Sequence, residues 1–177
     1  MNLRFLLVPA AAIAALPAAA QTSSPVDYVA SAGAADLFER QSSQLVLQTT
    51  RDPKVRSFAQ MMISDHGKST AEVKAAAAKD GVTAPPPKLM PDQEQQIAAL
   101  RSASGAARDA AYIRQQKVAH DQALAIHSGY SRSGTSPALQ VSCPLLSGPS
   151  TVLVWTMKEK QNAIEEAQAG GDHRQTA

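Results

Sequence analysis

Three polar residues of this chain lie where its helical pattern predicts a buried interior. Glu39, His66 and His120 each belong to a separate segment in which apolar residues recur at three- and four-residue spacing. Imidazole nitrogens and carboxylate oxygens on facing helices are the donors with which helical bundles hold transition metals. The same groups can instead hydrogen-bond to carboxylate or backbone partners and fix the register of the helices. The sequence leaves both possibilities open.

The two histidines carry the clearest positional signal. Around His66, apolar side chains recur on the same helical face, namely Val55, Phe58, Ala59, Met62, Val73 and Ala77. Around His120, the same spacing groups Ile113, Leu124 and His127 with it. We therefore expect both imidazoles to point inward. Glu39 follows Phe38 at an angle of about 100° around the helix, which predicts a boundary position.

A metal site of two histidines and one carboxylate would comprise His66, His120 and either Glu39 or Asp65. Di-iron bundles place a glutamate three residues before an inward histidine. The corresponding positions here hold an isoleucine and a lysine, which disfavours a di-iron centre. The metal hypothesis is therefore an iron, zinc or copper ion held by these four residues, without the di-iron arrangement.

The first twenty residues are typical of a cleavable secretory signal. Arg4 precedes the apolar residues 5–16, and three alanines end at Ala20. We expect cleavage near Ala20 and a periplasmic or secreted mature chain. No later stretch approaches the roughly 20 consecutive apolar residues of a transmembrane helix. Removal of Arg4 lowers the formal net charge from +2 to +1, which argues against a nucleic-acid partner.

The composition predicts an all-α chain. Alanine dominates, aromatic residues make up 4%, and β-branched runs are absent, which favours closely packed helices. We expect one helical bundle domain over residues 21–169 and a disordered tail over residues 170–177. The first helix is predicted over about residues 25–50, and the second over residues 53–79, because each follows a capping residue and begins with proline.

The second half of the chain is less regular. Residues 82–91 are rich in proline and are expected to form an extended crossover. A third helix is predicted over about residues 91–130, with a kink or short break near residues 104–105. A fourth helix is predicted from Pro137. Prolines and a glycine within residues 144–149 disfavour a helix interior, so we expect this fourth helix to be irregular or broken.

The stretch from Asp52 to His66, DPKVRSFAQMMISDH, resembles an exported bacterial family called domain of unknown function 4142. Other matching residues are Glu39, Ser104, Gly105, Asp109, Tyr112, Ala119 and His120. The family is often labelled a predicted outer membrane protein and is grouped with ferritin-like bundles. The resemblance covers about residues 27–139 and implies an up-down four-helix bundle outside the cytoplasm. It implies no activity, and the sequence itself favours the periplasm over the outer membrane.

The chain departs from this family at several positions. The fourth helix of the family carries a proline followed shortly by a His-Leu pair, whereas Cys143 and Pro144 are followed by no histidine before His173. The resemblance therefore implies that an inward ligand is missing, and a local frameshift or a decayed end after Cys143 is one hypothesis. Arg108 and His127 stand where the family usually has an aromatic and an apolar residue.

Two functions are compatible with the sequence. The first is a non-catalytic, exported module of the envelope, structural or stress-related, that acts through an envelope partner. The second is a metal-binding, ferritin-like protein that uses His66 and His120 with the nearby carboxylates of Glu39 and Asp65. No nucleophile motif supports an enzyme. The two functions differ in one measurable property, the presence of a bound metal ion.

Overall fold

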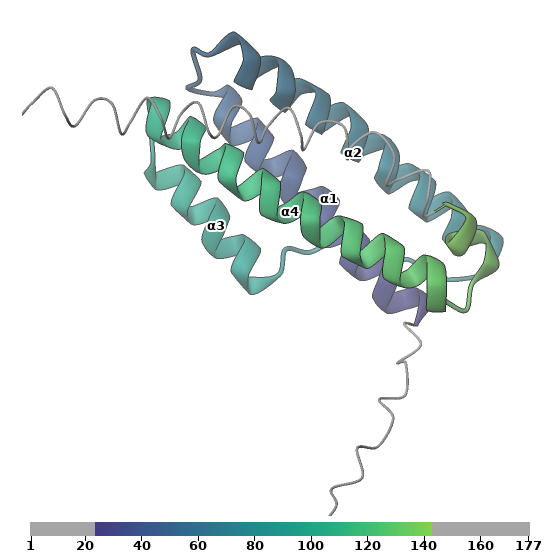
Figure 1. The fold of residues 1–177 in the computed structure, drawn as a ribbon. Helices are drawn as coiled ribbons and strands as arrows, with labels where there is room; N and C mark the ends of the chain where they lie inside the picture. The colour runs from purple at the N-terminus through teal and green to yellow at the C-terminus, as the bar shows by residue number, and fades with distance from the viewer. Residues whose placement is uncertain (1–23, 143–177) are drawn as a thin grey trace, which may run out of the picture.

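The computed structural model describes residues 24–142, and the long elements in this part of the chain are all α-helices (Figure 1). They are α1 (Pro25–Leu47), α2 (Pro53–Lys79), α3 (Pro91–Ser102) and α4 (Gly105–Ser133). For these residues, the prediction of an all-α chain is confirmed. The predicted signal segment, the tail and the prolines expected to interrupt the last helix lie outside the described residues.

Side-chain caps explain where the first two helices begin. The Ser24 hydroxyl accepts a hydrogen bond from the amide of Asp27, and the Asp52 carboxylate accepts from the amides of Lys54 and Val55. Proline follows each cap at the first helical position, where its missing N–H is not needed. Both helices therefore begin where the sequence predicted.

α1 is the central helix and contacts α2, α3 and α4. It can be covered on several sides because small residues such as Ala32, Ala34 and Ala35 are buried along it. Hydrogen bonds join Tyr28 to the late α4 residue His127, and Thr50 to the early α4 residue Asp109. α4 therefore runs antiparallel to α1, as α2 does in the hairpin that precedes it (Figure 1).

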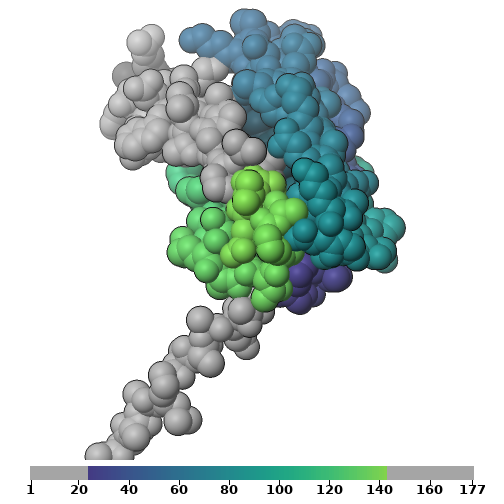
Figure 2. Space-filling model, turned by 90° about the vertical axis from the view of Figure 1, so that its right-hand side faces the viewer, coloured from purple at the N-terminus to yellow at the C-terminus, as the bar shows by residue number. Residues whose placement is uncertain are grey.

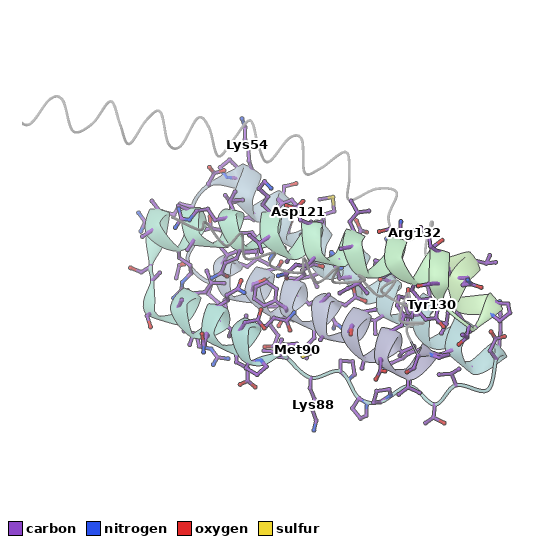
Figure 3. The ribbon with its side chains drawn as sticks, turned by 60° about the horizontal axis from the view of Figure 1, so that its bottom comes forward. Lys54, Lys88, Met90, Asp121, Tyr130 and Arg132 are labelled. Carbon is purple, nitrogen blue, oxygen red and sulfur yellow. The ribbon has the colours of Figure 1, made fainter. Side chains whose placement is uncertain are left out.

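The crossover between α2 and α3 passes along α1 as extended chain. Pro87 packs against Gly33, where an added Cβ would lie 3.4 Å from the proline ring. Figure 3 shows Lys88 pointing away from the helices and Met90 at the start of α3. A groove of about 310 Å³ opens there, with small side chains of α1 and α4 along it, including Ala34, Ala35, Ala119 and Ala125.

The chain reverses direction between α3 and α4, where the sequence predicted only a kink or short break in one helix. Gly105 has a φ of +53°, and the preceding Ser104 is extended. Gln115 of α4 donates to the carbonyl oxygen of Gln96 in α3, so the two helices lie side by side. A break is therefore present where the sequence predicted one, but the reversal was not predicted because a Ser-Gly pair is compatible with either a kink or a reversal.

α4 corresponds to the second part of the predicted third segment, and the predicted interruption of the helix from Pro137 lies outside the described residues. Because the expected third helix is two helices, the segment that begins at Pro137 comes fifth, and only its residues 137–142 are described. Asp80 at the end of α2 accepts hydrogen bonds from the Ser136 hydroxyl and the Ala138 amide. Figure 2 shows this short segment, in light green, against the end of α2.

Arg108 fixes the α3–α4 turn against α1. Its guanidinium donates to the carbonyl oxygens of Leu45, Arg101 and Ala103. These carbonyls lie at or next to the last turns of α1 and α3, where helical acceptors lack partners and carry partial negative charge. The buried guanidinium supplies both the donors and the opposite charge. Arg108, which stands where the family usually has an aromatic residue, therefore has a structural role.

We predict that Gly105→Ala lowers the free energy of unfolding by about 1 kcal/mol, because a residue with a Cβ is strained at positive φ. Gly67→Ala in α2 is the matched control. An added Cβ meets no atom within 4 Å at either position, and alanine is favoured over glycine inside a helix by up to about 1 kcal/mol. Urea unfolding should therefore give opposite signs for the two variants, and the same sign for both would contradict this account.

Candidate metal centre

Glu39 of α1, His66 of α2 and His120 of α4 meet in the interior, with exposed fractions of 0%, 8% and 5%. The prediction that both imidazoles point inward is confirmed. Glu39 was expected at a boundary and is instead fully buried, because other elements cover α1 on several sides. One ligand atom from each of the three residues lies within 4.8 Å of the other two.

The closest contacts of the cluster are between His66 and two carboxylates. The Nδ1 atom of His66 lies 2.8 Å from Oδ1 of Asp36 and 2.7 Å from Oε2 of Glu39. The Nδ1 atom of His120 lies 3.5 Å from Oε1 of Glu39. The two imidazole rings meet edge to face, with centroids 5.7 Å apart. Glu39 therefore lies between two imidazoles that come from different helices.

Asp65 lies outside this cluster, although the sequence suggested it as a ligand. It is exposed on α2 and forms an ion pair of 3.2 Å with Lys68. Adjacent residues on a helix diverge by about 100°, so the residue before an inward His66 turns away from the interior. Asp121, which follows His120, is likewise exposed on the outer side of α4 (Figure 3).

Asp36 is the carboxylate that the sequence interpretation missed. Its Oδ1 atom pairs with His66, and its Oδ2 atom accepts a hydrogen bond of 2.8 Å from the Thr70 hydroxyl. It precedes Glu39 by three residues, a spacing that places two side chains on the same face of a helix. That spacing was the available signal, and it could have indicated a pair of inward carboxylates on the first helix.

His66 is a cation in this environment. Its burial opposes protonation, but the hydrogen bonds and negative charges of Asp36 and Glu39 outweigh that effect and raise the pKa of His66 to about 10. The formal charges of two carboxylates and one imidazolium sum to −1. The cluster of Asp36, Glu39 and His66 therefore carries a net negative charge unless another cation is present.

The close partner of Glu39 is His66, whose Nδ1 atom lies 2.7 Å from the Oε2 atom of Glu39. The same Nδ1 atom is hydrogen-bonded to Asp36. One imidazolium offers a single Nδ1 hydrogen and a single positive charge to two buried carboxylates, which leaves Glu39 only partly compensated. A positive ion among these atoms would complete that compensation, so the residues fit a metal ion.

His120 is oriented by its own helix. Its Nδ1 atom lies 2.8 Å from the backbone carbonyl oxygen of Gln116. A carbonyl can only accept, so Nδ1 carries the hydrogen and a neutral His120 keeps its lone pair on Nε2. Both histidines therefore make the hydrogen bonds expected if they fix helix register, His66 to Asp36 and His120 to the carbonyl oxygen of Gln116. These hydrogen bonds also leave a nitrogen of His120 with the lone pair that a metal requires.

His127, where the sequence departs from the family, lies two helical turns beyond His120 and belongs to a separate aromatic cluster. Its Nδ1 atom is 2.9 Å from the hydroxyl of Tyr28, and Tyr28 stacks on Tyr130 with centroids 4.0 Å apart. Burial lowers the pKa of His127 below its ordinary value. This imidazole is therefore neutral at physiological pH, and it packs as part of the core.

We predict a pH dependence of stability that originates at His66 in the metal-free protein. Its pKa is raised from 6.5 to about 10 on folding, so its contribution is complete below pH 6.5 and is lost as the pH rises through 10. Between these values, the free energy of unfolding should fall by at most about 1.4 kcal/mol per pH unit. Urea unfolding from pH 6 to 10 measures this slope. His66→Gln should remove it, and an equal slope in both proteins would contradict the prediction.

Two solved structures are similar to this chain. CopM in the Ag-bound form matches with a TM-score of 0.65 and 16% sequence identity, over 80% of this chain and 97% of that chain. CopM in the Cu(II)-bound form matches with a TM-score of 0.66 and 15% identity, over 81% and 99% of the two chains. At this level of identity, the likeness shows a shared fold. No curated protein matches the chain.

The family resemblance seen in the sequence is confirmed over a long stretch. The family described as "Domain of unknown function (DUF4142)" matches residues 10–142. This range contains every residue of the buried cluster and all four long helices of the described part of the chain. Because the match covers more than half of its length, the chain belongs to the DUF4142 family.

Proposed function

We propose that this chain is a metal-binding protein that holds a transition metal ion between Glu39, His66 and His120. The observation that carries the proposal is the carboxylate of Glu39. It is fully buried, it lies between two imidazoles, and it shares the single Nδ1 hydrogen of His66 with Asp36. A metal ion is the partner that satisfies a buried carboxylate and two imidazole nitrogens together.

A divalent ion balances the charge of the cluster. Binding requires a neutral imidazole, so the ion replaces the proton of His66. The two carboxylates of Asp36 and Glu39 then face a charge of +2, and His66 and His120 are neutral. Two histidines and a carboxylate suit zinc, copper(II) and iron(II). The donors are therefore compatible with each of the three metals expected from the sequence, iron, zinc and copper.

Within this set of metals, the comparisons support copper. The structures with a similar fold are described as Ag-bound and Cu(II)-bound forms of CopM. A helical fold of this kind is thus compatible with copper, and the donors on this chain are of a type that copper(II) accepts. We further propose that the helices form an up-down bundle of the ferritin-like type.

We place this function in the periplasm, following the signal-like pattern of the first twenty residues. That segment lies outside the described residues. Among the helices that the structure describes, none is both long and apolar enough to cross a membrane. A metal-binding role in the periplasm needs only the residues of the cluster and an export signal.

A second candidate function is a non-catalytic structural module that acts through an envelope partner. The hydrogen bonds that join Asp36 to His66 and to Thr70 favour it, because they connect α1 to α2 without any ion. In this case the buried polar groups fix the register of the helices. The two candidate functions predict different amounts of bound metal when metal ions are added to the purified chain.

We predict that the wild-type chain binds about one Zn²⁺ or Cu²⁺ ion, and that His66→Ala and His120→Ala each abolish binding because each removes a nitrogen donor. Equilibrium dialysis with elemental analysis measures the stoichiometry. Asp65→Asn is the matched control, since Asp65 neighbours His66 but is exposed and should leave binding unchanged. A wild-type chain that shows neither bound metal nor a thermal shift with added metal would instead support the structural module.

We predict that the affinity for Zn²⁺ rises with pH. The ion must displace a proton from His66, whose pKa is raised to about 10, so the association constant should increase by about tenfold per pH unit below that value. Competition titrations with a chromophoric chelator at pH 6, 7 and 8 measure it, after correction for protonation of the chelator. An affinity that does not change over this range would place the ion away from His66.

A further inference from the structure

Gln116 is a fully buried amide next to the proposed metal site. It lies on α4 one turn before His120, and its exposed fraction is 0%. Its side-chain nitrogen donates to the hydroxyl of Ser42 at 2.8 Å. Its side-chain oxygen, Oε1, accepts no hydrogen bond within the described part of the chain. A buried amide oxygen without a donor is destabilising and calls for a partner.

The orientation of this amide follows from the hydrogens available. The Ser42 hydroxyl has one hydrogen, which it donates to the backbone oxygens of Phe38 at 2.8 Å and Glu39 at 3.1 Å. With this hydrogen used, Ser42 accepts from Gln116, which assigns the nitrogen of the amide to the side that faces Ser42. The oxygen of the amide is then the atom left without a partner in the interior.

The Gln116 amide and its partner Ser42 each lie one helical turn from a residue of the buried cluster, on α4 and α1 respectively. Ser42 lies one turn after Glu39 on α1, and Gln116 lies one turn before His120 on α4. The backbone oxygen of Gln116 accepts from His120, so the same residue contacts one imidazole and spans the gap between α1 and α4. The pair of Ser42 and Gln116 therefore lies one helical turn from Glu39 and His120, and the buried oxygen of Gln116 that lacks a donor belongs to the layer next to the cluster.

We propose that Oε1 of Gln116 is the fourth donor of the metal site and that it makes the site selective for divalent over monovalent ions. The inference rests on the proposed function. Together with His66, His120 and Glu39, it gives two nitrogen and two oxygen donors, a set that suits Zn²⁺ and Cu²⁺. Soft monovalent ions such as Ag⁺ prefer sulfur ligands and gain little from an amide oxygen. Ser42 is the residue that positions the amide.

Two substitutions at Gln116 test the role of its oxygen in the full-length, metal-free protein. Gln116→Leu keeps the volume but removes the donor, and Gln116→Glu keeps an oxygen at the same place. Competition titrations with chelators measure the affinities for Zn²⁺ and Ag⁺. We expect Gln116→Leu to weaken Zn²⁺ binding by about tenfold or more with little change for Ag⁺, and Gln116→Glu to retain Zn²⁺ binding.

The melting temperature of the metal-free protein shows whether Gln116 is a metal ligand or a structural residue. Gln116→Leu removes a buried acceptor that lacks a donor, so the melting temperature of the metal-free chain should not fall. Ser42→Ala and Ser43→Ala form a matched pair of buried hydroxyls on α1. Only Ser42 holds the amide, whereas Ser43 is bonded to Tyr112. Ser42→Ala should therefore weaken Zn²⁺ binding, and Ser43→Ala should not.

The possible failures are distinguishable. If Gln116→Leu binds Zn²⁺ as tightly as the wild type, the amide is not a ligand and this inference is overturned while the proposed function stands. If Zn²⁺ and Ag⁺ binding weaken equally, or if the metal-free variant melts at a clearly lower temperature, Gln116 is a structural residue and the inference is again overturned. A wild-type chain that binds neither ion overturns the proposed function and this inference together.

Discussion

The burial of one carboxylate, that of Glu39, is the constraint that orders the interior of this protein. A carboxylate removed from water must be balanced by positive charge or by donors. Because Glu39 lies on the central helix, that balance comes from the helices packed on either side, through His66 of α2 and His120 of α4. Each imidazole is held in turn, one by Asp36 and the other by its own backbone. The cluster therefore exists only when three helices are assembled.

The polar layer lies between two apolar layers that stabilise it. One contains Tyr28, Val29, Val73, Tyr130 and Leu139, and the other contains Val46, Val55, Phe58, Leu100 and Tyr112. Apolar packing of this kind is the main favourable contribution to folding, and it also excludes water from the cluster. Charges in such surroundings interact strongly, which is why Asp36 and Glu39 can raise the pKa of His66 so far despite its burial.

Features that depend on a single helix could be predicted from the sequence. The capping residues gave the starts of α1 and α2, and the apolar spacing correctly placed His66 and His120 inside. The spacing was less reliable for Leu124, which shares that pattern but is 45% exposed. Features that depend on how helices are arranged could not be predicted in the same way. The burial of Glu39 follows from the central place of α1, and the reversal at Gly105 becomes evident only when α3 lies beside α4.

α3 and the crossover before it contribute no side chain to the cluster, whose residues come from α1, α2 and α4. These parts of the chain form the outer wall of the groove at Met90 and cover one side of α1. Substitutions in α3 or the crossover can change the outer wall of this groove without replacing any residue of the buried cluster. The surface that this chain presents to its surroundings can therefore change while its buried cluster stays intact.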